Sequence, residues 1–138
     1  NAYICSLDLK RVQQYEEKRR ILFELFLSNL DLTKYYLPFE NMLQVRNTHF
    51  CLPVIVNLKY KKKSNLIKLV KSTLDNNLIE RRPIISQSIG RQLIYKEYCN
   101  YKDYENSEYL SKFGLYVGLF PKLKGKQVID LCIKLNDL

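Results

Sequence analysis

The residues best suited to bind a ligand lie in the stretch RRPIISQSIGR, at positions 81–91. Two adjacent arginines, Arg81 and Arg82, stand directly before Pro83, and small polar residues and a further cation follow. A guanidinium group donates paired hydrogen bonds to a phosphate or a carboxylate. No candidate nucleophile stands near these residues, so the stretch predicts a site for an anion. The opposing interpretation is that an arginine here only ties the end of a strand to a neighbouring carboxylate.

A second possible chemical pair is His49 and Cys51. Residues i and i+2 of a strand share one face, so the imidazole could activate the thiol. The sequence places no third group beside them, and a catalytic cysteine is therefore kept only as an alternative.

The cysteines show no metal-binding spacing. They stand far apart in the chain, without a C-x-x-C pair, at Cys5, Cys51, Cys99 and Cys132. A zinc site needs about four ligands, usually at short paired spacings. The first residues do not resemble a secretory signal, and no apolar run approaches the roughly 20 residues of a membrane span. We therefore expect reduced thiols and a cytoplasmic protein.

The chain of 138 residues carries a net charge of +9, from 23 basic and 14 acidic side chains. Such a balance can indicate a polyanionic partner such as nucleic acid. The lysines are spread along the chain, however, and only Lys59–Lys63 forms a dense cluster, where a strand is expected to meet a helix. We interpret the charge mainly as solvated surface, and a basic nucleic-acid-binding module is the alternative from another functional class.

Residues 90–108 are polar and rich in tyrosine, a composition that permits two interpretations. Tyrosine rings can stack on nucleic acid bases. Alternatively, the segment is a long loop with a helical turn, in which amphipathic rings cover an apolar surface. We favour the loop, because the lysines and tyrosines do not alternate as they would along a bound strand.

The elements that must position these residues predict an α+β fold, with a small three-stranded sheet covered by helices and a long N-terminal connecting helix. The expected order is helix, strand, helix, strand, loop, strand and helix, at residues 2–30, 50–58, 64–76, 79–85, 90–108, 114–120 and 125–137. A further short strand is possible at residues 35–37. Pro53 lacks an amide donor, which favours an edge strand or a bulge. Asn76 and Asn77 are expected to end their helix, since asparagine tolerates the left-handed conformation.

Several stretches, taken in order, resemble the DegT/DnrJ/EryC1/StrS aminotransferase family. The stretch NAYICSLDLKRVQQYEEKRR is similar to the family's "QLKRLDEFIEKRR" helix, and THFCLPV is similar to its "SWFGFPI" strand. NLIERRPI resembles "GIETRPI", FGLYVG resembles "NGFYVGN", and the last helix resembles the family's closing helix. The resemblance covers nearly the whole chain.

The resemblance implies the C-terminal domain of a type I aminotransferase fold. It divides the chain into a connecting helix (1–30) and a small α+β domain (31–138). The cofactor, pyridoxal 5'-phosphate, would be bound mainly by a large domain preceding Asn1, and no lysine here stands in the context of the Schiff-base lysine. We therefore expect a fragment that lacks catalytic and cofactor-binding residues and is inactive alone.

The full-length enzyme implied by the resemblance transfers an amino group, with glutamate the expected donor, to a nucleotide-linked keto-sugar. It would serve cell-surface polysaccharide or sugar biosynthesis, as a homodimer away from the membrane. A pyridoxal-phosphate-dependent sugar 3-dehydratase resembles this chain equally. A third possibility is a remnant that folds and only associates with partners.

The same resemblance suggests individual substrate-binding residues. Arg82 matches the motif arginine and Arg91 matches the arginine of "RPIISGNLLRQP", so both are expected to bind the phosphates of the substrate. Ser86 and Ser88 are expected to donate hydrogen bonds to sugar hydroxyls. The sequence departs from the pattern where Ser88 replaces asparagine and Leu93 replaces proline.

Overall fold

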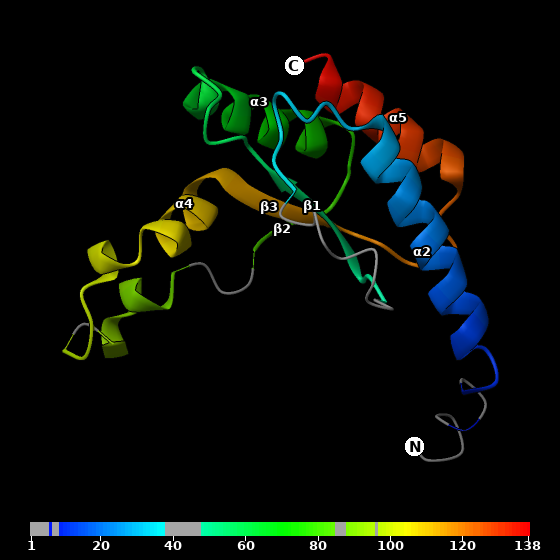
Figure 1. Cartoon of the computed structure of the whole chain (residues 1–138), viewed down its shortest axis with the longest axis horizontal. Coiled ribbons are helices and arrows are strands. Elements are labelled where there is room, and N and C mark those ends of the chain that lie inside the picture. The colour runs from blue at the N-terminus through cyan, green and yellow to red at the C-terminus, as the bar shows by residue number, and fades with distance from the viewer. Residues whose placement is uncertain (1–5, 7–8, 38–47, 85–87, 96) are drawn as a thin grey trace.

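The computed structural model describes residues 6, 9–37, 48–84, 88–95 and 97–138. Its helices are α2 (Val12–Asn29), α3 (Lys63–Asn76), α4 (Glu105–Phe113) and α5 (Gly125–Asn136), and its strands are β1 (Cys51–Ile55), β2 (Arg81–Pro83) and β3 (Gly114–Gly118). Three short 3-10 turns lie at Ile89–Arg91, Leu93–Tyr95 and Tyr101–Asp103. The mixed fold with a small three-stranded sheet confirms the expected class (Figure 1).

The sheet is antiparallel, with β3 in the centre and β1 and β2 at its edges. Pro53 lies on the edge strand β1, opposite Tyr116 of β3, as its missing amide donor predicts. Tyr116 also pairs with Arg82 on the other side. A row of three side-chain positions, Pro53–Tyr116–Arg82, therefore crosses the sheet on one face.

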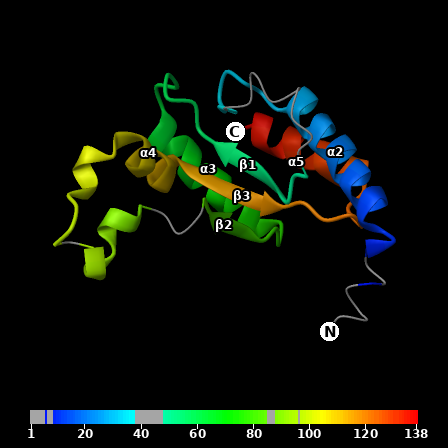
Figure 2. The ribbon, with the colours of Figure 1, turned by 60° about the horizontal axis from the view of Figure 1, so that its bottom comes forward.

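One face of the sheet forms the core. Leu52 and Val54 of β1 and Leu115 and Val117 of β3 are buried, while the intervening residues are more exposed. Helices α3 and α5 cover the apolar face, and α2 packs beside α5 (Figures 1 and 2). Their buried residues include Phe23, Phe26, Leu66, Val70, Leu74, Val128, Leu131 and Leu135. No described helix covers the opposite face.

The first helix is shorter than predicted. Lys10 and Arg11 form a turn, and α2 begins at Val12 without a side-chain cap. A continuous helix over residues 2–30 is therefore wrong at positions 10 and 11, while residues 1–5, 7 and 8 lie outside the described part. The continuous pattern of charged and apolar residues concealed this break.

The predicted loop at residues 90–108 contains more structure than expected. One helical turn was expected, whereas the structure has three 3-10 turns and the start of α4. The extent of this helical structure was missed, since few apolar residues there recur at helical spacing. The ring of Tyr109 contacts Phe113, and its hydroxyl group donates to the carbonyl of Val56 at 2.6 Å. By contrast, Tyr98 is 81% exposed, so its ring does not cover an apolar surface.

Helix α3 ends at Asn76, as predicted, but the left-handed conformation falls one residue after the two asparagines. Asn77 has a φ of −96°, and the left-handed residue is Leu78, with a φ of 55°. Leu78 aligns with the glycine of the "GIETRPI" pattern, which explains why the backbone here has a conformation that suits glycine.

Two further short-range predictions concern residues 35–37 and the lysine cluster. Near residues 35–37, an isolated bridge joins Tyr35 to Val56, and no longer strand forms within the described residues. The cluster Lys59–Lys63 lies where β1 leads into α3, as expected, and its last residue, Lys63, begins α3. Among the described residues, no helix is both long and apolar enough to cross a bilayer.

Candidate anion-binding site

The two adjacent arginines point to opposite faces of the sheet. Arg81 lies on the helix-covered side, where its Nε and Nη2 donate to the two carboxylate oxygens of Asp75, each at 2.9 Å. Arg82, one residue later, lies on the helix-free face. Because side chains alternate along a strand, the guanidinium of Arg81 is paired with Asp75, whereas the guanidinium of Arg82 stays accessible on the other face.

Arg82 has a partner, but an exposed one. Its Nε and Nη2 donate to Oε1 of Glu80 at 2.8 and 2.6 Å, and the two side chains are 64% and 74% exposed. The hydrogen bond with Glu80 raises the pKa of Arg82 further, so the guanidinium is always charged. An exposed ion pair of this kind contributes little to stability, and an external anion can replace the carboxylate at small cost.

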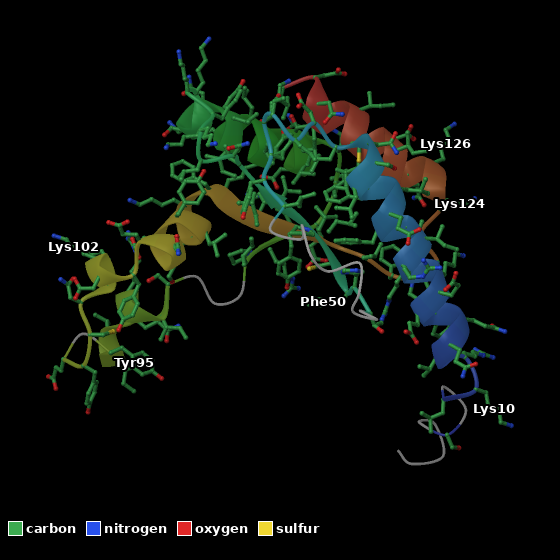
Figure 3. All side chains as sticks on the ribbon, in the orientation of Figure 1. Lys10, Phe50, Tyr95, Lys102, Lys124 and Lys126 are labelled. Carbon is green, nitrogen blue, oxygen red and sulfur yellow. The ribbon has the colours of Figure 1, made fainter. Side chains whose placement is uncertain are left out.

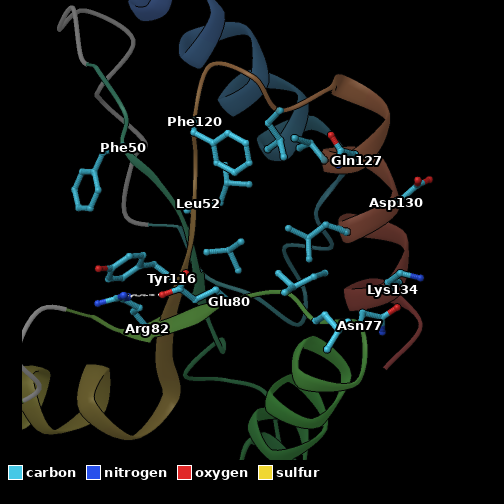
Figure 4. A pocket seen from close by; sticks show the side chains of 17 residues that line it. Phe50, Leu52, Asn77, Glu80, Arg82, Tyr116, Phe120, Gln127, Asp130 and Lys134 are labelled. Carbon is cyan, nitrogen blue, oxygen red and sulfur yellow. Dashed lines mark hydrogen bonds and ion pairs between the residues drawn. The ribbon is translucent and has the colours of Figure 1, made fainter.

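A pocket of about 650 Å³ adjoins this pair, between the sheet and α5 (Figure 4). Apolar side chains from the sheet and α5 form its walls, and its rim carries Glu80, Arg82, Gln127, Asp130 and Lys134. The ring of Phe50 meets that of Tyr116 edge-on, with centroids 5.8 Å apart. Charged groups at the rim and apolar or aromatic surfaces within are typical of small-molecule sites.

The other predicted residues lie elsewhere. Arg91 binds Glu108 of α4 and lines a different pocket from the one that Arg82 lines. Ser88 is 2% exposed and lies near the same glutamate, whose pKa it helps to lower. Ser86 lies outside the described residues. The structure thus brings Ser88 and Arg91 together at Glu108 and leaves Arg82 in a separate setting.

The sequence analysis missed Glu108, which has the largest resolved pKa shift of any described carboxyl group. Hydrogen bonds from Arg91 and Ser88 lower its pKa from 4.5 to about 2. Glu108 stands 17 residues from Arg91, so the sequence gives no direct reason to pair them. Predicting α4 would have been needed to bring Glu108 near Arg91, and the polar sequence did not indicate that helix. Tyr116 was missed as a site residue because strand register brings it beside Arg82. Glu80 was missed although it stands only two residues before Arg82 in the sequence.

The His49–Cys51 alternative lacks support in the structure. Burial raises the pKa of the Cys51 thiol and lowers the pKa of His49. The His49 ring stacks on Phe23, with centroids 3.5 Å apart. A raised pKa disfavours the thiolate, which is the nucleophilic form.

The described residues offer no obvious holder for a metal or a lysine-bound cofactor. No group of three potential ligands occurs among the described histidine, cysteine and acidic side chains. Every described lysine is exposed or half-buried, so none lies in an enclosed pocket of the kind that holds a Schiff base.

In Figure 3, Phe50 lies well away from Tyr95 and Lys102. Phe50 lies beside the sheet at the start of β1, near the pocket rim. Tyr95 and Lys102 lie on a segment that extends beyond α4. We call residues 88–95 and 97–104 of this segment the arm.

Comparisons with known proteins identify a family and a fold. A model of the DegT/DnrJ/EryC1/StrS aminotransferase family matches residues 1–136. A comparison with curated protein sequences found no match.

Several solved structures are similar. The putative sugar aminotransferase Spr1654 from Streptococcus pneumoniae, in its PMP form, has a TM-score of 0.79 at 12% identity, over 95% of this chain and 32% of that one. Helicobacter pylori PseC, an aminotransferase in pseudoaminic acid biosynthesis, has a TM-score of 0.75 at 15% identity, over 94% and 34%. E. coli GDP-4-keto-6-deoxy-D-mannose-3-dehydratase has a TM-score of 0.64 at 21% identity, over 92% and 32%. The chain therefore spans about a third of the length of these structures.

Proposed function

Because this chain belongs to the DegT/DnrJ/EryC1/StrS aminotransferase family, we propose that it is the substrate-facing small domain of a pyridoxal-phosphate-dependent enzyme. The proposed substrate is a nucleotide-linked keto-sugar, and the proposed reaction is amino transfer, with glutamate as donor. The observation that carries this proposal is the position of Arg82. It lies on the helix-free face of the sheet, in the stretch that resembles the family's "RPI" motif.

The helix-free face suits a phosphate-containing sugar. Arg82 presents a planar donor edge for a phosphate, and its carboxylate partner is exposed and replaceable. Tyr116 offers a ring beside it, with Phe50 set edge-on, and sugar and base rings pack well on such surfaces. The residues of this chain would bind and orient the substrate.

The cofactor belongs in another part of the proposed enzyme. The described lysines do not lie in enclosed pockets, so these residues do not fit pyridoxal phosphate as its Schiff-base holders. Two of the similar structures carry the cofactor in a PMP or hydrated PLP form, and about two thirds of each has no counterpart in this chain. We propose that the cofactor and its lysine lie in that remainder.

The proposal that the cofactor and its lysine lie outside these residues can be tested on the 138-residue chain. Incubation with pyridoxal phosphate, reduction with borohydride and mass spectrometry should reveal no site-specific pyridoxyl adduct, only the low scatter expected of surface lysines. The chain should also fail to convert a nucleotide-linked keto-sugar with glutamate. Stoichiometric labelling of one lysine, or turnover, would contradict the proposal.

A sugar 3-dehydratase is the second candidate, because the solved structures similar to this chain include GDP-4-keto-6-deoxy-D-mannose-3-dehydratase. The two reactions differ in product, since amino transfer yields an amino sugar and dehydration yields a deoxy sugar. Product analysis on an enzyme containing this small domain separates the two.

A further inference from the structure

Glu108 lies at the centre of the contacts between the arm and α4. Its carboxylate accepts hydrogen bonds from Nε of Arg91, at 2.9 and 3.0 Å, and from Nη2 of the same guanidinium. Ser88, buried at the base of the arm, lies near this carboxylate and helps to lower its pKa. The guanidinium of Arg91 also lies 4.8 Å from the centroid of the Tyr101 ring. The Arg91–Glu108 ion pair thus joins the arm to α4.

The Arg91–Glu108 pair has the geometry of a bound oxyanion. Two oxygens of one planar group face the Nε–Nη2 edge of the guanidinium, which is the edge that a phosphate uses in bidentate binding. An external phosphate and Glu108 therefore compete for the same two donors. Arg91 cannot bind both at full strength.

The surroundings of the pair suit an anion. A pocket of about 420 Å³ beside it is lined by three cations, Arg91, Lys102 and Lys112, and by two carboxylates, Glu105 and Glu108. Aromatic side chains complete the lining, from Tyr101, Tyr109 and Phe113. Lys112 also helps to keep Glu108 ionised through its positive charge. If Glu108 moved away, Arg91, Lys102 and Lys112 would have one negative charge fewer beside them. An arriving anion could then replace that charge.

We propose that Glu108 is an internal substitute for the substrate's phosphate, and that anion binding at Arg91 requires its displacement. The site takes a phosphate or pyrophosphate group, and this inference rests on the proposed function, in which Arg91 belongs to the substrate-binding residues. Displacement of Glu108 also breaks the Arg91–Glu108 ion pair, which joins the arm to α4. Anion binding therefore loosens the arm from α4. Substrate entry and the position of the arm are thereby coupled.

Removing the internal anion tests the inference directly. Binding of inorganic pyrophosphate is measured by isothermal titration calorimetry at low ionic strength for the wild-type chain, Glu108→Gln and Glu105→Gln. The control substitution removes the same charge three residues earlier on α4, from an exposed carboxylate that lines the same pocket but makes no ion pair with Arg91 in the described structure. It therefore separates loss of the competitor at Arg91 from a general loss of negative charge at the pocket. We expect Glu108→Gln to bind pyrophosphate about tenfold more tightly than wild type, as loss of a charge-assisted competitor implies, and Glu105→Gln to stay within about twofold.

Two further variants separate competition from altered folding. Ser88→Ala weakens the hold on Glu108 without changing charge, and we expect an intermediate gain in affinity. Adding Arg91→Gln to Glu108→Gln should abolish the gain. Amide NMR spectra confirm that each variant keeps the sheet and α4 intact.

The inference is overturned if folded Glu108→Gln binds pyrophosphate no more tightly than Glu105→Gln, or if the gain survives loss of Arg91. Its failure is distinguishable from failure of the proposed function. If the gain appears, but no variant binds a nucleoside diphosphate sugar, the competition at Arg91 stands and the proposed substrate is wrong. If the gain is absent while Arg82 is needed for sugar-nucleotide binding, the proposed substrate stands and the competition is wrong.

Discussion

At the scale of single residues, neighbours in the chain can have unrelated roles because a strand alternates its side chains. Arg81 binds Asp75 on the covered side of the sheet, whereas Arg82 reaches the open face. Alternation could be predicted from the sequence, but which arginine would face the helices could not. That depends on the register of β2 against β3, and β2 has only three residues.

Leu78 carries a branched side chain at a position whose backbone conformation favours glycine. Its φ of 55° is the left-handed conformation, and the side chain is 94% exposed. We expect Leu78→Gly to raise the free energy of unfolding by about 1 kcal/mol, because glycine removes the steric cost of Cβ in this conformation. Urea denaturation measures the change.

The control for this prediction is Leu78→Ala. It removes the exposed apolar side chain but keeps Cβ, so it should give little of the gain. Equal stabilisation by alanine and glycine would assign the effect to apolar exposure and contradict the account of backbone strain.

At the scale of elements, the arm is attached to α4 by an ion pair whose strength depends on pH. The pKa of Glu108 is lowered from 4.5 to about 2, so the folded state binds fewer protons than the unfolded state between these values. The attachment is fully present above about pH 4.5 and is lost as the pH falls through about 2. Amide NMR signals of Ser88 and Gly90, followed through this range, should shift with an apparent pKa near 2.

Substitution by glutamine removes the titrating group. In Glu108→Gln, we expect the arm signals to show no transition with that midpoint, while the signals of β3 behave as in wild type. Persistence of the same transition would show that another group controls the arm.

Helix α2 is held through a few deeply buried side chains. Phe26 is fully buried against the core, whereas Ile21 on the same helix is about half exposed. We expect Phe26→Ala to lower the free energy of unfolding by about 3–5 kcal/mol and Ile21→Ala to cost less than about 1 kcal/mol. Thermal and urea unfolding compare the two, and similar costs would contradict this packing of α2.

The elements differ in how well the sequence predicted them. Apolar, β-branched runs marked β1 and β3, and Pro53 indicated an edge strand, because these are local physical constraints. Helix α4 was missed since its stability depends on contacts such as Tyr109 with Phe113 and with the carbonyl of Val56, which are tertiary. Glu108 could not be assigned to the site without that helix.

At the scale of the whole molecule, the sheet has one covered face and one open face. Helices α3 and α5 bury the first, and the row Pro53–Tyr116–Arg82 crosses the second. The chain also spans about a third of the solved structures that it resembles. An open face that carries the exposed guanidinium of Arg82 is consistent with a small domain that meets its substrate there.

The central claim is that Arg82 on the open face binds the phosphates of a nucleotide-linked sugar. The most direct test is calorimetric titration of GDP-mannose and UDP-N-acetylglucosamine into the wild-type chain, Arg82→Gln and Arg81→Gln. The two variants lose the same charge from adjacent positions on opposite faces. The account predicts that Arg82→Gln weakens binding about tenfold, while Arg81→Gln, checked for folding, stays within about twofold of wild type. Equal effects of the two substitutions, or no effect of Arg82→Gln, would contradict it.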